Sequence, residues 1–145
     1  MMQHPLISDY IKHNQYGQLI GMDFEIIKSG LLHYRLNIQA KHLATPLAAH
    51  GGLIASLCDA ALGVVALSAV CEQNKVVSTV EYKINFISPA QLNNTLLAVS
   101  KVESKGNRII VSSCDVFCEN DNMRLVAKAL GTFNAYPAEK AGYSK

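Results

Sequence analysis

The segment from Leu43 to Cys71 most constrains how this chain folds, because its 29 residues include a single formal charge, Asp59. Aliphatic residues recur throughout it, and a helix that is apolar on all sides is either buried or membrane-spanning. An Asp near the middle of a membrane span costs about 2.5–3.5 kcal/mol on insertion scales. We therefore expect the core helix of a globular domain, with no membrane partner.

Asp59 is the first candidate for chemistry. A carboxylate buried in such a helix must be paired, protonated or used, because removing its charge from water is costly. Backbone N–H groups at the start of the helix, where His50, Gly51 and Gly52 lie, are unpaired and carry partial positive charge. They can polarise a carbonyl oxygen, while Asp59 acts as a nucleophile or a general base.

The spacing of these two groups limits how they can cooperate. Asp59 follows Gly51 by eight residues, which is about 12 Å along a helix that rises 1.5 Å per residue. One carbonyl group cannot contact both residues of the same chain. A site that uses both must combine Asp59 of one subunit with Gly51 of another, which predicts a homodimer whose two helices run antiparallel across a two-fold axis.

Composition excludes several classes of protein. Of the 145 residues, 50% are hydrophobic and 17% charged, which excludes a disordered chain and suits one domain. The net charge of +2 comes without a basic run, so we expect no nucleic-acid partner. The four cysteines lack the spacing of metal ligands, which predicts reduced, buried thiols and no metal. The polar N-terminus lacks a signal-peptide core, and we expect a cytoplasmic protein.

Hydrophobic periodicity predicts an α+β fold. A short N-terminal helix over Pro5–Gln15 and a long helix of about 20 residues from Gly51 accompany six strands. The strands are expected over Gln18–Ile27, Leu32–Gln39, Val76–Ile87, Thr95–Val102, Arg108–Cys118 and Arg124–Ala135. We expect an antiparallel sheet of about six strands wrapped around the long central helix, with one flank of that helix open to a partner chain. The division is residues 1–16 as the N-terminal helix, 17–136 as the main domain and 137–145 as a flexible tail.

Two motifs carry a resemblance to a known family. The stretch His50–Asp59 resembles the H-G-G-x(6)-D signature of hotdog-fold acyl-CoA thioesterases, in the phenylacetate-degradation (PaaI-like) branch. Val80–Ala90 is similar to a strand of that family that ends in Ser-Pro-Ala. The resemblance covers about residues 17–135. It implies the hotdog fold, dimers that often pair into tetramers, and hydrolysis of acyl-CoA thioesters without a metal or an organic cofactor.

The resemblance also implies roles for individual residues. Asp59 would be the nucleophile or general base, and the Gly51 N–H of the other subunit would polarise the thioester carbonyl. His50 would orient the site or the leaving thiolate, and Thr79 would help to hold the attacking water. The substrate-binding residues would be Gly52, Thr45, Ser88, Pro89, Lys105, Asn107 and Arg108, with the basic Lys105–Arg108 turn near the CoA phosphates.

One position departs from the family pattern. Relatives often have an Asn six residues before the H-G-G His, and Ala44 stands there. The hydroxyl of Thr45 or a water molecule would then replace the missing amide. Several small residues along the helix leave room for a medium-chain or aryl acyl group; these are Ala55, Ala60, Ala61 and Gly63.

Two other functions remain open at this point. A hotdog module could bind acyl-CoA or another apolar ligand without turnover, and the change at Ala44 favours that alternative modestly. An enoyl or hydroxyacyl hydratase usually pairs a His with an Asp or Glu in one site, and the D-x(4)-H pattern of one such branch is absent from the sequence. Release of free thiol over a series of acyl-CoA substrates separates the three.

Overall fold

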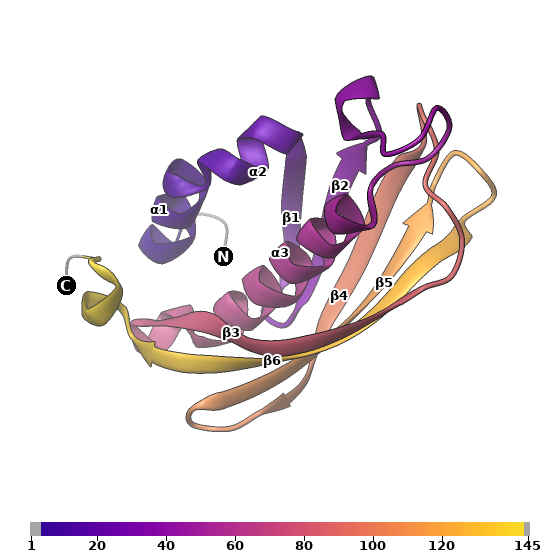
Figure 1. Ribbon diagram of the computed structural model, residues 1–145. Coiled ribbons are helices and arrows are strands. Elements are labelled where there is room, and N and C mark those ends of the chain that lie inside the picture. Colours follow the sequence, from indigo (N-terminus) through magenta and orange to yellow (C-terminus); the bar gives the residue numbers. More distant parts are fainter. Residues whose placement is uncertain (1–3, 144–145) are drawn as a thin grey trace.

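The computed structural model describes residues 4–143 and has one long helix held in a curved sheet (Figure 1). The central helix α3 spans Gly51–Val70. The strands are β1 (Met22–Lys28), β2 (Leu31–Asn37), β3 (Lys75–Phe86), β4 (Thr95–Lys105), β5 (Ile109–Cys118) and β6 (Arg124–Pro137). The remaining elements are the helices α1 (Pro5–His13) and α2 (Gln15–Ile20) and the 3-10 turns η1 (Ala40–His42), η2 (Cys71–Gln73) and η3 (Ala138–Ala141).

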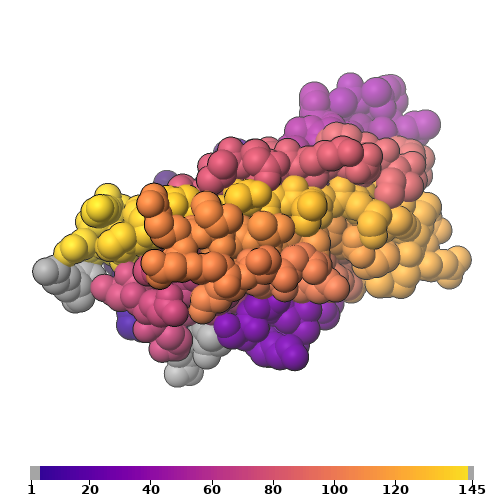
Figure 2. Space-filling view, turned by 90° about the horizontal axis from the view of Figure 1, so that it is seen from below, coloured from indigo at the N-terminus to yellow at the C-terminus, as the bar shows by residue number. Residues whose placement is uncertain are grey.

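The six strands form one antiparallel sheet in the order β1-β2-β4-β5-β6-β3. Three of the connections are short hairpins, whereas β3 leaves the sequence order and becomes an edge strand beside β6. On the outer face of the sheet, β3, β6 and β5 lie side by side (Figure 2). The predicted α+β architecture, six strands around one long helix, is confirmed.

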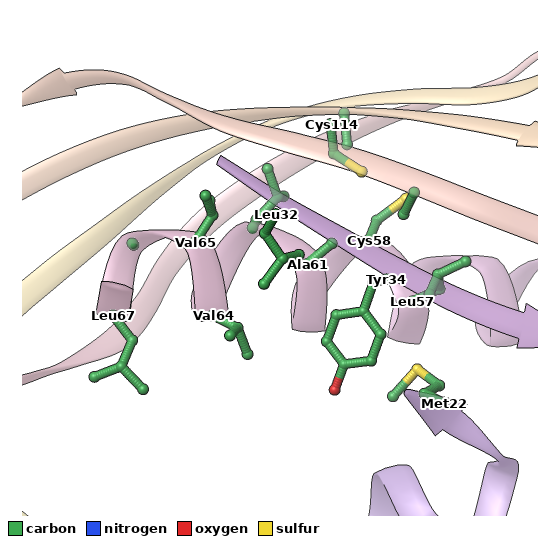
Figure 3. Close-up of a cluster of buried hydrophobic side chains, with 14 of the residues drawn as sticks. Met22, Leu32, Tyr34, Leu57, Cys58, Ala61, Val64, Val65, Leu67 and Cys114 are labelled. Carbon is green, nitrogen blue, oxygen red and sulfur yellow. The ribbon is translucent and has the colours of Figure 1, made fainter. Parts of the chain in front are cut away.

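The core lies between α3 and the concave face of the sheet. Twelve of the 20 residues of α3 are buried, and Figure 3 shows Leu32 and Tyr34 of β2 lying against this helix. The segment Gly51–Gln73 is long and apolar enough to cross a membrane by composition alone, but most of it is buried within the protein. This is the position expected of a core helix, and its apolar residues are explained by packing.

The N-terminal prediction is partly wrong, because residues 18–20 belong to a second helix. The Asn14 side chain accepts a hydrogen bond from the Gly17 N–H (3.1 Å) and so caps α2 at its start. Gly21, in the left-handed conformation with φ of 88°, ends the helix, as glycine commonly does. The first strand therefore begins at Met22, not at Gln18, and Gly17 lies inside a helix.

A register slip in β3 also departs from simple alternation. Thr79 pairs with Phe133 while Glu81 pairs with Thr132, so Val80 is an extra residue in the strand. A bulge of this kind redirects the side chains on either side of it. Thr79 faces α3, where it bonds Asp59, whereas Glu81 bonds Thr132. Strict alternation along this strand would predict Thr79 and Glu81 on one face of the sheet, and the slip at Val80 places them on opposite faces.

The C-terminal segment packs on the domain as far as it is described. Ala138 is buried and its N–H donates to the Asn74 carbonyl at 3.0 Å. Tyr143 is partly buried and packs against the core. Residues 144 and 145 lie outside the described part of the chain, and the division into N-terminal helix, main domain and tail stays a prediction.

Candidate active site

Asp59 and Thr79 meet beside the middle of α3. The Thr79 hydroxyl donates a hydrogen bond of 2.9 Å to Asp59 Oδ1. Asp59 is only half-buried, so the deep burial expected for it is wrong. The reason is that Asp59 lies on the side of α3 that the sheet leaves uncovered, together with Ala55, Ser56, Ala60 and Gly63, which are also half-buried.

These two side chains line a cavity of about 330 Å³. Its wall along α3 consists of Asp59, Ala60, Gly63, Val64 and Leu67, and β3, β6, α1 and the C-terminal segment supply the rest. Apart from the carboxylate, the groups that α3 contributes are aliphatic or small. Thr79 and three tyrosines add hydroxyl groups to the lining. A carboxylate and hydroxyls beside small and aliphatic helix residues suit a substrate that has an apolar part and one reactive polar group.

The start of α3 forms a second, separate feature. His50 is the N-cap residue, with φ of −58° and ψ of 139°, and its side chain makes no capping bond. Within residues 4–143, the N–H groups of Gly51 and Gly52 have no hydrogen-bond acceptor. Gly51 lines a surface hollow of about 320 Å³ with Phe86, Ser88 and other residues of the β3–β4 connection. These unpaired donors can polarise an approaching carbonyl oxygen.

The Ser88-Pro89-Ala90 loop is fixed in place by Arg124, a residue that the sequence analysis missed. The Arg124 guanidinium donates to Ser88 Oγ (2.6 Å), to the Pro89 carbonyl (2.8 Å) and to Asn94 Oδ1 (3.2 Å). Ala90 in turn accepts from the Ala49 N–H at 2.8 Å, one residue before the N-cap. Ser88 and Pro89 therefore support the position of the helix start, and their polar atoms already have partners within the chain.

Thr45 and Gly52 also use their polar groups locally. Thr45 Oγ1 accepts hydrogen bonds from the N–H groups of Ala48 (3.0 Å) and Leu47 (3.4 Å), so the hydroxyl stabilises its own turn. The Gly52 carbonyl accepts from Ser56 Oγ at 3.0 Å. The loop before α3 is thus preformed.

The basic turn between β4 and β5 lies at the other end of the domain from Gly51. Asn107 accepts two hydrogen bonds from Lys75 Nζ, at 2.9 and 3.1 Å, and Lys75 begins β3 just after α3 has ended. The Arg108 carbonyl accepts from the Ala135 N–H, and the side chains of Lys105 and Arg108 are exposed. One chain therefore brings Asp59 and Thr79 together but separates them from Gly51 and from the Lys105–Arg108 turn.

Among the described residues, His4, Cys71 and Glu72 form a cluster with metal-ligand chemistry, and their ligand atoms lie within 4.8 Å of one another. The Leu6 N–H donates to His4 Nδ1 at 3.2 Å, which leaves the proton of the neutral ring on Nε2. That nitrogen faces Glu72 at 3.9 Å. A metal would need the lone pair of Nε2, so this geometry suits a His–Glu contact rather than a metal site.

Comparison with known proteins identifies the class. Residues 48–124 match the model of a family described as the Thioesterase superfamily. "Putative esterase SSO1253" of Saccharolobus solfataricus is 30% identical over 130 residues, which cover 90% of this chain and 83% of that protein. The chain belongs to the thioesterase superfamily, and it is an enzyme of the thioester hydrolase class.

Solved structures place the chain within the hotdog fold. A Streptococcus mutans protein bound to acetyl CoA is 26% identical, with a TM-score of 0.72 over 80% of this chain and 89% of that one. The PaaI protein from the phenylacetic acid degradation operon of Escherichia coli has a TM-score of 0.78 over 89% of each chain. Its identity of 19% shows the shared fold alone. The superfamily is therefore confirmed, and the PaaI-like branch stays a prediction.

Proposed function

We propose that this protein hydrolyses medium-chain or aryl acyl-CoA thioesters in a site built from two copies of the chain, as a member of the PaaI-like branch. The observation that carries the proposal is the hydrogen bond of 2.9 Å between Thr79 and Asp59 at the wall of a cavity whose α3 side is otherwise small or aliphatic. The carboxylate supplies the reactive group and the cavity accommodates the acyl chain. CoA itself is the product that carries the thiol.

The chemistry balances with a water molecule as the second reactant. Thr79 donates to one oxygen of Asp59, which leaves the other oxygen free to accept a proton from water. Hydroxide attacks the thioester carbonyl, the C–S bond breaks, and the proton passes to the CoA thiolate. Alternatively, Asp59 attacks the carbonyl directly and water hydrolyses the resulting anhydride. In that route the proton released from water passes to the CoA thiolate. One turnover in ¹⁸O-labelled water separates general-base attack from an anhydride that water opens at the Asp59 carbonyl, because only the latter leaves the label on Asp59 and not in the product acid.

The Gly51 N–H of a second copy would stabilise the negative charge that develops on the carbonyl oxygen, while the nearby His50 orients the leaving thiolate. Edge strand β3 supports this assembly, because Val80 and Phe86 are each 58% exposed and its outer edge has no pairing strand among residues 4–143. Exposed, unpaired edges of this kind readily pair with another chain. Two β3 edges joined across a two-fold axis bring small-residue faces of α3 together.

The Lys105–Arg108 turn would bind the CoA phosphates through its exposed cations, and Gly52, Thr45, Ser88 and Pro89 would shape the entrance near the helix start. A homodimer is the minimal active unit in this proposal. Sedimentation or light scattering measures it directly and shows whether dimers pair further into a homotetramer.

The test of the proposed function is thiol release from acyl-CoA substrates by purified protein. Asp59→Ala and Asp59→Asn should each lower kcat by about 10²–10⁴-fold, the usual contribution of a general base, with the circular dichroism spectrum unchanged. Thr79→Val should lower kcat more than Thr79→Ser, which retains the hydroxyl. Full activity in both Asp59 variants would remove the proposal. Saturable protection by acyl-CoA without thiol release would indicate a binding module instead.

A further inference from the structure

The cavity beside Asp59 has a length and a direction. Its wall along α3 runs from Asp59 to Leu67, eight residues or about 12 Å at 1.5 Å per residue. On the sheet side, Thr79 and its partner Phe133 line the cavity next to the carboxylate. The pair Val76 and Tyr136 lines it further along. The cavity therefore extends from the carboxylate toward the C-terminal end of α3.

The C-terminal segment lines the cavity at the end away from Asp59. Ala141 and Tyr143 are both cavity-lining residues. The turn η3 that leads to them is bound to Asn74, just beyond the end of α3, through the Ala138 N–H. The Tyr143 N–H then donates to the Ala138 carbonyl at 3.3 Å, which folds the tyrosine back over the turn.

The N-terminal helix holds Tyr143 from the other side. The rings of His13 and Tyr143 meet edge to face, with centroids 6.3 Å apart. Tyr10, one turn earlier in α1, also lines the cavity. Figure 1 shows η3 near α1, and the contact of His13 with Tyr143 joins segments from the two ends of the chain.

We infer that Tyr143, held by α1 and η3, ends the acyl pocket and sets the longest acyl chain that the enzyme accepts. This inference rests on the proposed function. A zigzag chain of C–C bonds of about 1.5 Å advances about 1.25 Å per bond, so a pocket of about 12 Å accommodates a straight acyl chain of about eight to ten carbons. The preferred substrates are then medium-chain, unbranched acyl-CoA thioesters.

The test is the profile of kcat/KM against acyl length, from about four to sixteen carbons, for wild type and three variants. Tyr143→Ala removes the ring and should raise the activity on chains of twelve to fourteen carbons relative to eight by about tenfold or more, the usual effect of one or two accommodated methylenes. Tyr143→Phe keeps the ring and should keep the wild-type length optimum. Ala60→Leu fills the cavity near Asp59 and should shift the optimum to shorter chains.

The outcomes separate the two proposals. No thiol release by wild type with any acyl length overturns the proposed function and this inference with it. Release by wild type with the same length optimum in a folded Tyr143→Ala overturns only the inference, whatever the optimum of Ala60→Leu. Thermal unfolding of each variant checks its fold. If Tyr143→Ala fails to fold, the shift in Ala60→Leu and a Tyr10→Ala variant decide the question, because both residues line the same cavity.

Discussion

Mixing two inactive variants should restore activity if Asp59 of one chain works with Gly51 of another. The first variant is Asp59→Ala, and the second is Gly51→Pro, which deletes the proposed N–H donor. Gly51 is the first helical residue, a position that tolerates proline. His50 has the extended ψ of 139° that a residue before proline requires. A Cβ at Gly51 would meet nothing nearer than Phe86 at 3.7 Å, so the helix should remain intact.

The expected loss of kcat differs between two substitutions at Gly51. Loss of one oxyanion donor costs about 10²–10³ in kcat, or about 2.7–4 kcal/mol of transition-state stabilisation. Gly51→Ala keeps the N–H and should lose far less. Random reassembly of equal amounts gives about half hybrid dimers. Each hybrid has one site with both defects and one with none, so the mixture should regain about a quarter of wild-type activity.

The assay is thiol release after the two variants are unfolded together and refolded, with hybrid dimers counted by native mass spectrometry using a tag on one variant. Each variant refolded alone is the control. Hybrid dimers that form in the expected amount and show no activity above that of the parents would refute the shared site. Recovery well above a quarter would contradict the assumption that each dimer carries two independent sites.

Three further outcomes follow from the packing. Burial raises the pKa of the Tyr34 hydroxyl above its ordinary value. The folding stability linked to this group is therefore present below pH about 10, and it is lost as the pH rises above that value. Between pH 9 and 11, the free energy of unfolding measured in urea should fall less for Tyr34→Phe than for wild type. Arg124→Lys cannot bond Ser88, the Pro89 carbonyl and Asn94 together, and it should lower the free energy of unfolding by about 1.5–3 kcal/mol and reduce kcat. Ser112→Ala removes a buried hydrogen bond of 3.0 Å to the Leu62 carbonyl and should cost about 1 kcal/mol in the same urea assay, with activity retained.

The central helix and the six strands could be predicted because their signals are local. A long run with a single charge indicates a core helix, and alternation of apolar residues indicates strands. The start of β1 could not be placed, since Leu19 and Ile20 look like strand residues until the cap at Asn14 is seen. The face of Thr79 could not be predicted either, because the slip at Val80 is decided by the pairing with β6.

The candidate site was likewise only partly predictable from the sequence. The family resemblance assigned Asp59 and Thr79 to one site, and the two side chains lie 2.9 Å apart; their catalytic roles stay predictions. Arg124 and Tyr143 were not predicted. Arg124 reaches Ser88 across 36 residues of sequence, and Tyr143 lines the cavity only because η3 returns to the end of α3. Neither residue belongs to a motif, so a single sequence carries no signal for them.

The extra residue Val80 lets β3 place both Thr79 and Tyr82 on the helix side of the sheet, which strict alternation does not allow. Before Val80, Thr79 points at the reactive carboxylate; after it, Tyr82 pairs with Gly131 and its Cβ lies close to where a Gly131 side chain would stand, on the helix side of the sheet. If Val80 were paired as an ordinary strand residue, a strand that aims the hydroxyl inward would turn that aromatic ring outward. One unpaired residue thereby lets an odd-numbered and an even-numbered side chain serve the same interior.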